Sequence, residues 1–246
     1  MRIFDEEKEL AIPQWITISS SASTIQTQAV KLNDRHGECP TGKEQYSSKT
    51  FQCSGTIPTD SARAVEKERS RLLSLLSGKD LIVYRDDEDT VFYRCRLTGS
   101  IQVTYYNGEN LHKVFTISFT LKAFDPFGYG PKKMQAINAG IQTLTIENEG
   151  NYLSIPEIEI TDIDYVDGIL FQCNDSFLEV NRKINLPEGG MLTYKNSCLY
   201  LNGKDISYSL SDRSFITPLY FQAGRNQLKV KIHAGMIRLS YYGRYI

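Results

Sequence analysis

The sequence has few of the features that mark secreted or membrane-spanning proteins. Its longest apolar runs, such as residues 115–121, are interrupted by Thr and Ser. They fall well short of the roughly 20 apolar residues that span a bilayer. The first ten residues are acidic rather than basic and lead into no uninterrupted apolar segment, so they do not fit a signal peptide. We therefore expect no membrane span, and a chain that is made and retained in a cytoplasm.

An excess of charge of one sign is also missing. The 28 Lys and Arg residues nearly balance 29 Asp and Glu residues, and the formal net charge is -1. Without a positive field over the whole chain, nothing draws in nucleic acid or an anionic membrane non-specifically. The 246 residues, 41% of them hydrophobic, can instead fill one large or two modest hydrophobic cores.

Motifs of known catalytic chemistry are scarce. No GxSxG, GxxxxGK[ST] or post-strand GxGxxG pattern occurs, and Gly128-Tyr129-Gly130 lies in a segment bounded by Pro. No HExxH or HxH motif occurs either, and the histidines are far apart, at His36, His112 and His233. The sequence thus predicts no catalytic residue, no cofactor and no metal site.

The cysteines form no recognisable framework. There are five of them, an odd number, and no CxxC pair is present. This spacing favours reduced thiols over a disulfide or zinc framework. The residues concerned are Cys39, Cys53, Cys95, Cys173 and Cys198.

Two functional alternatives need no sequence motif. Glycoside hydrolysis requires only two well-placed carboxylates, and Glu157 with Glu159, or Asp162 with Asp164, alternate as such a pair could. Their alternation with isoleucines favours the solvent face of strands. Saccharide binding requires exposed aromatic rings. The aromatic candidates are Trp15, Tyr241, Tyr242 and Tyr245, although strand tyrosines more often pack in a core or an interface.

The sequence is rich in short β-strand patterns. Residues 101–105 and 114–122 flank Asn107-Gly108 and predict a hairpin, with Phe115, Ile117, Phe119 and Leu121 on one buried face. Residues 91–97 and 81–85 predict two more strands. The acidic turn at 86–89 between them lacks the Gly and terminal Glu of a calcium loop and indicates a solvated hairpin tip. The polar segment 33–49 is long for a loop of a compact domain and could be a flexible hairpin or an arm that orders on a neighbouring subunit.

One helix interrupts these strands. Asp60 or Ser61 can cap its start, and Gly78 can end it. On a helical wheel Val65, Leu72, Leu75 and Leu76 share a face, with Leu73 at its margin. The sequence predicts an amphipathic helix over 61–77 that packs on a sheet.

The chain divides into two predicted domains. Residues 124–131, FDPFGYGP, are dense in Gly, Pro and aromatic residues, and a polar stretch follows to Gly140. Beyond it come short strand patterns about ten residues apart, with turns at Asp167-Gly168 and Asn202-Gly203. We predict a mainly β protein: an N-terminal β-sandwich or split-barrel domain with one helix, residues 1–130, and a helix-free β-sandwich, residues 131–246.

The order of these features resembles a known family. Residues 51–57, FQCSGTI, lead into the helix, LIVY follows at 81–84, and FDPFGYGP precedes the sandwich. This resembles the distal tail proteins of siphophages that infect Gram-positive hosts, in which an FxxxGxI-like strand precedes a Leu-rich, charged helix and an aromatic DPF element closes the first domain. The resemblance covers essentially the whole chain.

The resemblance implies a structural, non-enzymatic protein. It implies a homo-hexameric ring at the virion tail tip, assembled in the host cytoplasm, in which the N-terminal domain forms the ring and the galectin-like C-terminal sandwich points outward. The implied partners are the major tail tube protein, the tape-measure protein, the tail-associated lysin or tail-spike base, and in some phages receptor-binding proteins. DNA would cross the lumen without sequence-specific binding. The helix 61–77 and the hairpin 101–121 are the candidate ring-forming elements; the alternative is a module that binds host cell-wall saccharide.

Overall fold

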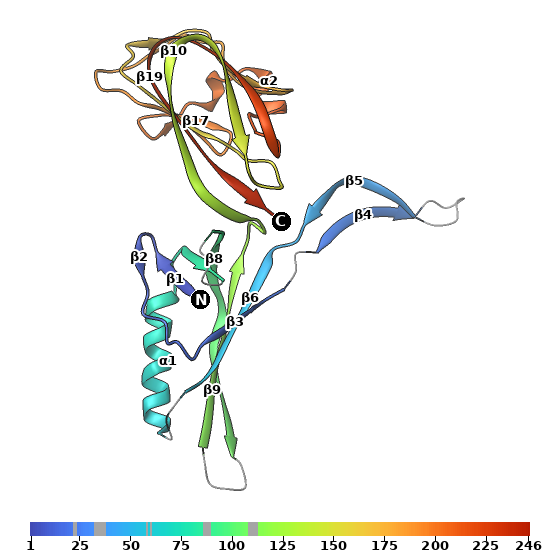
Figure 1. The fold of residues 1–246 in the computed structure, drawn as a ribbon, viewed down its shortest axis with the longest axis vertical. Helices are drawn as coiled ribbons and strands as arrows, with labels where there is room; N and C mark the ends of the chain where they lie inside the picture. The colour runs from blue at the N-terminus through green and yellow to red at the C-terminus, as the bar shows by residue number, and fades with distance from the viewer. Residues whose placement is uncertain (22–23, 32–37, 58, 60, 86–89, 108–112) are drawn as a thin grey trace. The chain divides into compact units, whose positions relative to one another are not determined.

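The chain folds into two compact units. The computed structural model describes residues 1–21, 24–31, 38–57, 59, 61–85, 90–107 and 113–246. Residues 1–128 together with Ile246 form unit 1, and residues 129–245 form unit 2. Both units are built mainly from β-strands (Figure 1), which confirms the predicted fold class. The roles assigned to the domains 1–130 and 131–246 stay predictions.

Unit 1 contains an antiparallel sheet in the order β3-β6-β9-β8-β7-β1-β2. Its strands are β1 Arg2–Asp5, β2 Lys8–Glu9, β3 Thr17–Ser20, β6 Lys49–Ile57, β7 Leu81–Tyr84, β8 Phe92–Asn107 and β9 Lys113–Ala123. The start of β8 pairs with β7 and the rest pairs with β9. Strand β8 therefore connects the strands β7, β1 and β2 on one side of it with β9, β6 and β3 on the other.

The predicted hairpin is confirmed, and its first strand is longer than expected. Val103 pairs with Ile117 and Tyr105 with Phe115, and the four predicted inward residues of β9 are all buried. Residues 91–97 and 101–105 were expected to be separate strands, but 92–107 form the single strand β8. A register shift between Thr98 and Gln102, with Gly99 at φ 72°, hides this continuity because a bulge interrupts the alternation of period two. The acidic turn 86–89 lies outside the described residues.

Helix α1 spans Ala62–Leu76 and confirms the predicted helix. Ser61 is the N-cap and accepts a hydrogen bond from the backbone amide of Ala64, while Asp60 lies outside the described residues. Val65, Leu72 and Leu76 are buried in one core with residues of β7 and β8, including Leu81 and Cys95. The apolar face of α1 thus covers one side of the sheet of unit 1 (Figure 1).

Strands β4 Ile25–Lys31 and β5 Glu38–Tyr46 form a two-stranded antiparallel sheet of their own. The backbone pairs Val30 with Cys39 and Lys31 with Glu38. Much of the segment 33–49, expected to be a polar loop that could form a hairpin or an arm, is the strand β5 of this antiparallel pair, whereas residues 32–37 lie outside the described residues. The bounds of the strand could not be predicted from the polar composition, because a backbone ladder forms without an alternating apolar face.

Strand β10, Gly128–Asn148, occupies the segment expected to be a linker. The glycines were interpreted as breakers, but they serve close packing. A Cβ atom on Gly128 would lie 2.4 Å from Cγ1 of Val91, and one on Gly130 would lie 3.1 Å from Cε2 of Tyr245. Glycine lets these neighbouring side chains lie close to the backbone, and the segment is a strand rather than a turn.

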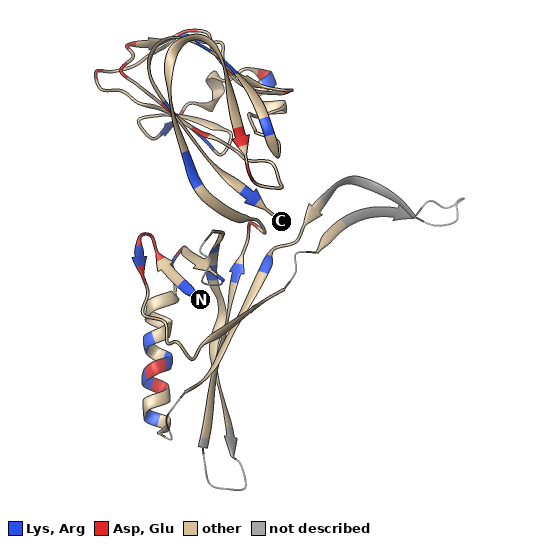
Figure 2. Cartoon of the chain, in the orientation of Figure 1, with Lys and Arg blue, Asp and Glu red and all other residues tan. Residues whose placement is uncertain are grey.

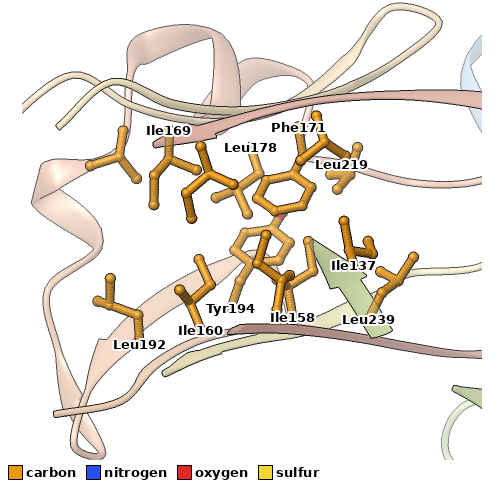
Figure 3. Close-up of a cluster of buried hydrophobic side chains, with 14 of the residues drawn as sticks. Ile137, Ile158, Ile160, Ile169, Phe171, Leu178, Leu192, Tyr194, Leu219 and Leu239 are labelled. Carbon is orange, nitrogen blue, oxygen red and sulfur yellow. The ribbon is translucent and has the colours of Figure 1, made fainter. Parts of the chain in front are cut away.

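Unit 2 is a two-layer β-sandwich. One layer has the order β18-β17-β16-β11-β19-β10, and in the other β14 pairs with β13 and β13 with β19. Its strands are β10, β11 Glu157–Thr161, β12 Tyr165–Val166, β13 Ile169–Cys173, β14 Ser176–Val180, β15 Ile184–Asn185, β16 Leu192–Lys195, β17 Cys198–Leu201, β18 Lys204–Asp205 and β19 Gly224–Tyr245. Figure 3 shows the core, where Phe171 and Leu178 of one layer face Ile158 and Tyr194 of the other.

The last strand joins the two layers. Residues 227–232 and 236–242 were expected to be separate strands, but both belong to β19. Its first half pairs with β13 and its second half with β11. Between them Gly235 has φ 102°, a conformation open to glycine that allows the strand to turn from one layer to the other without ending.

The expectation of a helix-free second domain was wrong. A 3-10 turn covers Ser207–Ser209, and a short helix α2 covers Asp212–Ile216, with Ser211 as its N-cap. Five residues are too few to show a helical period in a sequence. Ser214 fixes α2 to strand β14, since its hydroxyl accepts a hydrogen bond from the backbone amide of Glu179 at 2.8 Å.

Candidate functional site

The first candidate pair of catalytic carboxylates lies on the outer face of β11. Ile158 and Ile160 point into the core, so Glu157 and Glu159 point outward. A carboxylate oxygen of Glu157 lies 3.2 Å from the Lys195 ammonium, and a carboxylate oxygen of Glu159 lies 3.4 Å from the Arg238 guanidinium. Both carboxylates are thus part of cross-strand ion pairs on the sheet surface.

The second pair, Asp162 and Asp164, lies after the end of β11. Both residues are exposed and Asp162 has φ 54°, while the intervening Ile163 is buried. The geometry places the pair in a turn. The alternation with isoleucine seen in the sequence reflects solvent exposure in both pairs.

The proposed sugar-stacking tyrosines are largely used in packing. Tyr241 is only 6% exposed, its hydroxyl donates to the Glu147 carbonyl at 3.0 Å, and its ring packs edge-on against Phe221. Burial raises the pKa of this phenol above its ordinary value. The half-buried ring of Tyr242 lies edge-on to Tyr129, with centroids 5.8 Å apart. Tyr241 therefore has no free face for a sugar.

Trp15 belongs to unit 1 and packs against its core. It lies on Gly55 of the FQCSGTI strand: a Cβ atom there would be 2.3 Å from the Trp15 carbonyl oxygen and 2.7 Å from its ring atom Cε3. The glycine of the FxxxGxI-like pattern is thus needed for close approach of another chain segment. The FxxxGxI-like pattern pointed to Gly55, but nothing in the sequence predicted its contact with Trp15.

The thiols described by the structure are free and mostly buried. Cys53, Cys95 and Cys173 are buried and Cys198 is half-buried. Burial raises the pKa of Cys53 and that of Cys95 to about 12, so both stay protonated at neutral pH. The side chain of Cys39 lies outside those described.

Within the described ranges, no group of three or more His, Cys, Asp or Glu side chains is placed to hold a metal ion. His233 stacks on Tyr165 with ring centroids 4.6 Å apart. His36 and His112 lie outside the described residues. In the same part of the chain, no helix is both long and apolar enough to cross a membrane.

The DPF element closes unit 1 by packing. Phe127 is 7% exposed and its ring contacts that of Tyr46 at 5.7 Å between centroids. The Asp125 carboxylate accepts a hydrogen bond from the Phe127 amide at 3.4 Å. This aromatic segment thus links the end of β9 to the end of β5.

The outer face of α1 is charged and internally paired. A carboxylate oxygen of Glu66 lies 2.8 Å from the Arg69 guanidinium, and one of Glu68 lies 2.6 Å from that of Arg71. Arg71 also donates to the Ala11 carbonyl at 2.9 Å, so it anchors the segment before β3. This surface is a mixed-charge face rather than a basic stripe for nucleic acid.

An open hollow of about 700 Å³ lies on β7 and β8. Ile82, Arg94 and Phe124 contribute to its lining, and Phe124 is 61% exposed. Asp80 and Arg96 form an ion pair at its rim. Aromatic residues are enriched at protein contact surfaces, and the sequence marked Phe124 only as part of the FDPFGYGP segment.

Comparisons with known proteins give a match at the level of structure. No family model matches the chain, and no curated protein matches it. The Dit protein of phage SPP1, described as a paradigm of the hub adsorption apparatus in Gram-positive infecting phages, superimposes with a TM-score of 0.71. The match covers 100% of this chain and 99% of the SPP1 chain at 16% identity. The two chains therefore share one fold over their full length.

A chain of the phage P2 baseplate, in its activated conformation with Ca, superimposes with a TM-score of 0.44 at 9% identity. That match covers 97% of this chain and 96% of the P2 chain. The resemblance to distal tail proteins is confirmed as a shared fold by the SPP1 protein.

Proposed function

We propose that this chain is a structural component of a phage tail tip: a distal tail protein whose six copies form a ring between the tail tube and the baseplate. The observation that carries the proposal is the shared fold with the SPP1 hub protein over both units. The match supports this role because it covers both the domain that we expect to form the ring and the sandwich after it. We also propose that unit 2 is the galectin-like sandwich expected for such a protein.

The separate sheet β4-β5 supports assembly with other copies. Among the described strands, β4 and β5 pair only with each other. A lone two-stranded sheet is marginally stable in water. It gains stability when a neighbouring chain adds to its edge or covers it. We propose that β4-β5 orders on the adjacent subunit of the ring, together with contacts of α1 and of the β8-β9 hairpin.

The proposed role needs no catalysis. The candidate carboxylates lie in surface ion pairs or in an exposed turn, and extended interfaces carry the function instead. The expected neighbours are the last ring of the tube protein, the tape-measure protein and the tail-associated lysin or tail-spike base, with receptor-binding proteins in some phages. The protein would be found at the virion tail tip after assembly in the host cytoplasm.

The test is the mass of the purified chain by light scattering over a range of concentrations, followed by negative-stain imaging of the large species. We expect a species of six times the chain mass that appears as a ring with a central hole. If the chain alone stays a monomer, the measurement is repeated with the tape-measure and tube proteins. A monomer under both conditions would refute the ring.

A matched pair of variants tests the part played by β4-β5. Val30→Pro places a residue without a backbone N–H and with a fixed φ inside β4, whereas Val30→Thr keeps the N–H and a β-branched side chain. We expect Val30→Pro to lower the ring population while the unfolding transition of each unit is unchanged, and Val30→Thr to assemble like the wild type. If both variants assemble equally well, β4-β5 is not part of the interface between subunits.

A further inference from the structure

Strand β19 carries charge of one sign only. The whole chain has slightly more acidic than basic residues, yet β19 contains no Asp or Glu. In Figure 2 this strand accordingly has blue segments and no red ones. Its Lys and Arg residues are Arg225, Lys229, Lys231, Arg238 and Arg244.

The two halves of β19 use these cations differently. In the second half Arg238 lies in its ion pair with Glu159, and Arg244 is only 9% exposed. The cations of the first half are all exposed. Within the part of the chain that the structure describes, none of them has an ion pair or a side-chain hydrogen bond; they are Arg225, Lys229 and Lys231.

These three cations point to one face of unit 2. Alternate residues of a strand share a face, and the residues between them, such as Leu228 and Val230, are buried in the sandwich. The outward positions therefore form a line, which we call the basic row. It consists of Arg225, Gln227, Lys229, Lys231 and His233.

Neutral side chains lie directly beside the basic row. On β13 the register places Gln172 opposite Lys229 and Leu170 opposite Lys231. On β10 the Thr145 hydroxyl accepts a hydrogen bond from the Gln227 amide at 3.2 Å. The carboxylates of this face lie further out, since Glu179 is separated from Lys231 by Leu170 and Glu147 follows two residues after Thr145.

A polar hollow of about 180 Å³ opens on the basic row. It is lined by Gln172, Asn174, Gln227 and Lys229. The Gln172 amide donates to the Asn174 carbonyl at 3.4 Å, which orients one of these side chains. Each side-chain amide has two donor hydrogens and an acceptor oxygen, so the hollow keeps further capacity for hydrogen bonds beside an ammonium group.

Aromatic rings near the row are in contact with further cations. The ring of Tyr165 stacks on His233, and the Lys183 ammonium lies 4.6 Å from the centroid of the same ring. Phe177, opposite Gln172 on β14, has the Arg213 guanidinium 5.7 Å from its ring centroid. These rings thus place positive charge at both sides of the row rather than free faces for stacking on bases or sugars.

We infer that the basic row binds a linear polyol phosphate, a polymer in which phosphodiesters alternate with hydroxyl-bearing carbon units. Each phosphate neutralised by Lys or Arg releases counterions and strengthens binding. Lys229 and Lys231 are two residues apart, so their Cα atoms lie about 6.8 Å apart along the strand. At this spacing successive phosphates of one extended chain can each meet an ammonium group, which binds phosphate as a point charge.

The hollow accounts for the carbon units between the phosphates. Side-chain amides can donate to and accept from hydroxyl groups, whereas they add little to the binding of a bare phosphate chain. A nucleic-acid strand would instead need open aromatic faces for its bases, and the rings here are in contact with cations. Binding along one strand of unit 2 requires no ring, so it is independent of the proposed function.

A charge-matched pair of double variants tests the site in the full-length chain. Lys229→Gln with Lys231→Gln removes two cations from the basic row, and Lys195→Gln with Lys204→Gln removes two exposed cations from the other layer of unit 2. The probe is fluorescein-labelled poly(glycerol phosphate), followed by fluorescence anisotropy at low salt. We expect the first double variant to bind at least about tenfold more weakly than the wild type, and the second to bind like the wild type.

The salt dependence checks the same contacts. The log–log slope of binding against salt should weaken by about 1.4 in the first double variant, because each phosphate contact of a single strand contributes about 0.7. Lys229→Arg with Lys231→Arg should keep the affinity, and equal Tm values would show that all variants are folded. Absence of binding by the folded wild type, or equal losses in both Gln double variants, would overturn the site whether or not the chain forms rings.

Two comparison probes test the class of ligand. Oligothymidylate with the same number of phosphates and poly-glutamate should both bind the wild type more weakly than poly(glycerol phosphate). Gln227→Leu should reduce the preference for poly(glycerol phosphate) over oligothymidylate, because it removes an amide from the hollow. Tighter binding of oligothymidylate would assign the row to nucleic acid, and tighter binding of poly-glutamate would assign it to an acidic protein; either result would overturn the polyol phosphate. An unchanged preference in Gln227→Leu would overturn the role of the hollow.

Discussion

Replacing Gly55 by alanine should destabilise unit 1 through a single contact. The added Cβ would lie 2.3 Å from the Trp15 carbonyl oxygen and 2.7 Å from the ring atom Cε3. Overpacking in a core typically costs about 1–3 kcal/mol. Because the nearest atom belongs to the main chain and cannot rotate away, we expect the upper end of that range, about 3 kcal/mol.

The assay can follow unit 1 alone. Trp15 is the single tryptophan of the chain and lies in unit 1, so its fluorescence reports the unfolding of this unit. One kcal/mol shifts Tm by about 4–8 °C in a small domain and about 2–4 °C in a larger one, so we expect Gly55→Ala to lower Tm by about 10 °C. The transition of unit 2, followed by circular dichroism, should not move.

Two further variants separate the causes. Ser54→Ala, on the exposed face of the same strand, should stay within about 0.5 kcal/mol of the wild type. Trp15→Ala combined with Gly55→Ala removes the ring contact but keeps the carbonyl contact, so only part of the loss should be recovered; circular dichroism follows this variant. An unchanged Tm for Gly55→Ala would refute the close approach of the Trp15 segment to β6.

Three other predictions concern single contacts. Asn148→Ala should cost about 2 kcal/mol in chemical denaturation, because the buried side-chain amide donates to the carbonyls of residues 152, 221 and 222 and accepts from the Gly150 amide, and the substitution removes these hydrogen bonds. Cys53 and Cys95 should resist a thiol reagent at pH 8 until unit 1 unfolds. Their folded pKa of about 12 exceeds the unfolded value near 9, so the free energy of unfolding of unit 1 should fall as the pH rises from about 9 to about 12. Glu68→Gln should lower the free energy of unfolding by about 0.5 kcal/mol at neutral pH, because it removes the ion pair with Arg71. The hydrogen bond from Arg71 lowers the pKa of Glu68, so the difference from the wild type should shrink below about pH 4, where protonation of Glu68 removes the ion pair in the wild type as well.

Each of these has a result that would contradict it. Asn148→Ala with wild-type stability would mean that water replaces the amide at the carbonyls. Rapid labelling of Cys53 or Cys95 in the native protein would show that the core under α1 opens readily. A constant difference between Glu68→Gln and the wild type down to low pH would assign the loss to packing rather than to charge.

Local patterns predicted the elements whose signal lies within one segment. The inward residues of β9 alternate with a period of two, and the apolar residues of α1 recur with the helical period between a Ser cap and Gly78. These periods follow from backbone geometry, so they are visible without any partner. The surface position of Glu157 and Glu159 was predictable for the same reason.

Glycine misled the sequence interpretation because it has two structural uses. The same residue that permits a turn also permits a close approach of two segments. Gly128 and Gly130 serve the second use within β10, although beside Pro131 they look like a linker. Only the positions of Val91 and Tyr245 in the fold distinguish the two cases.

A mainly β chain with one long helix and two regions could be predicted from the sequence, since these features follow from local periodicity and composition. Only the fold shows that Thr17, Ser54, Ser118 and Gln102 lie opposite one another in one row across the sheet. These four residues lie on four strands that are distant in the chain. Their register depends on which strands pair and where the β8 bulge shifts the alignment, and no local pattern encodes such long-range pairing.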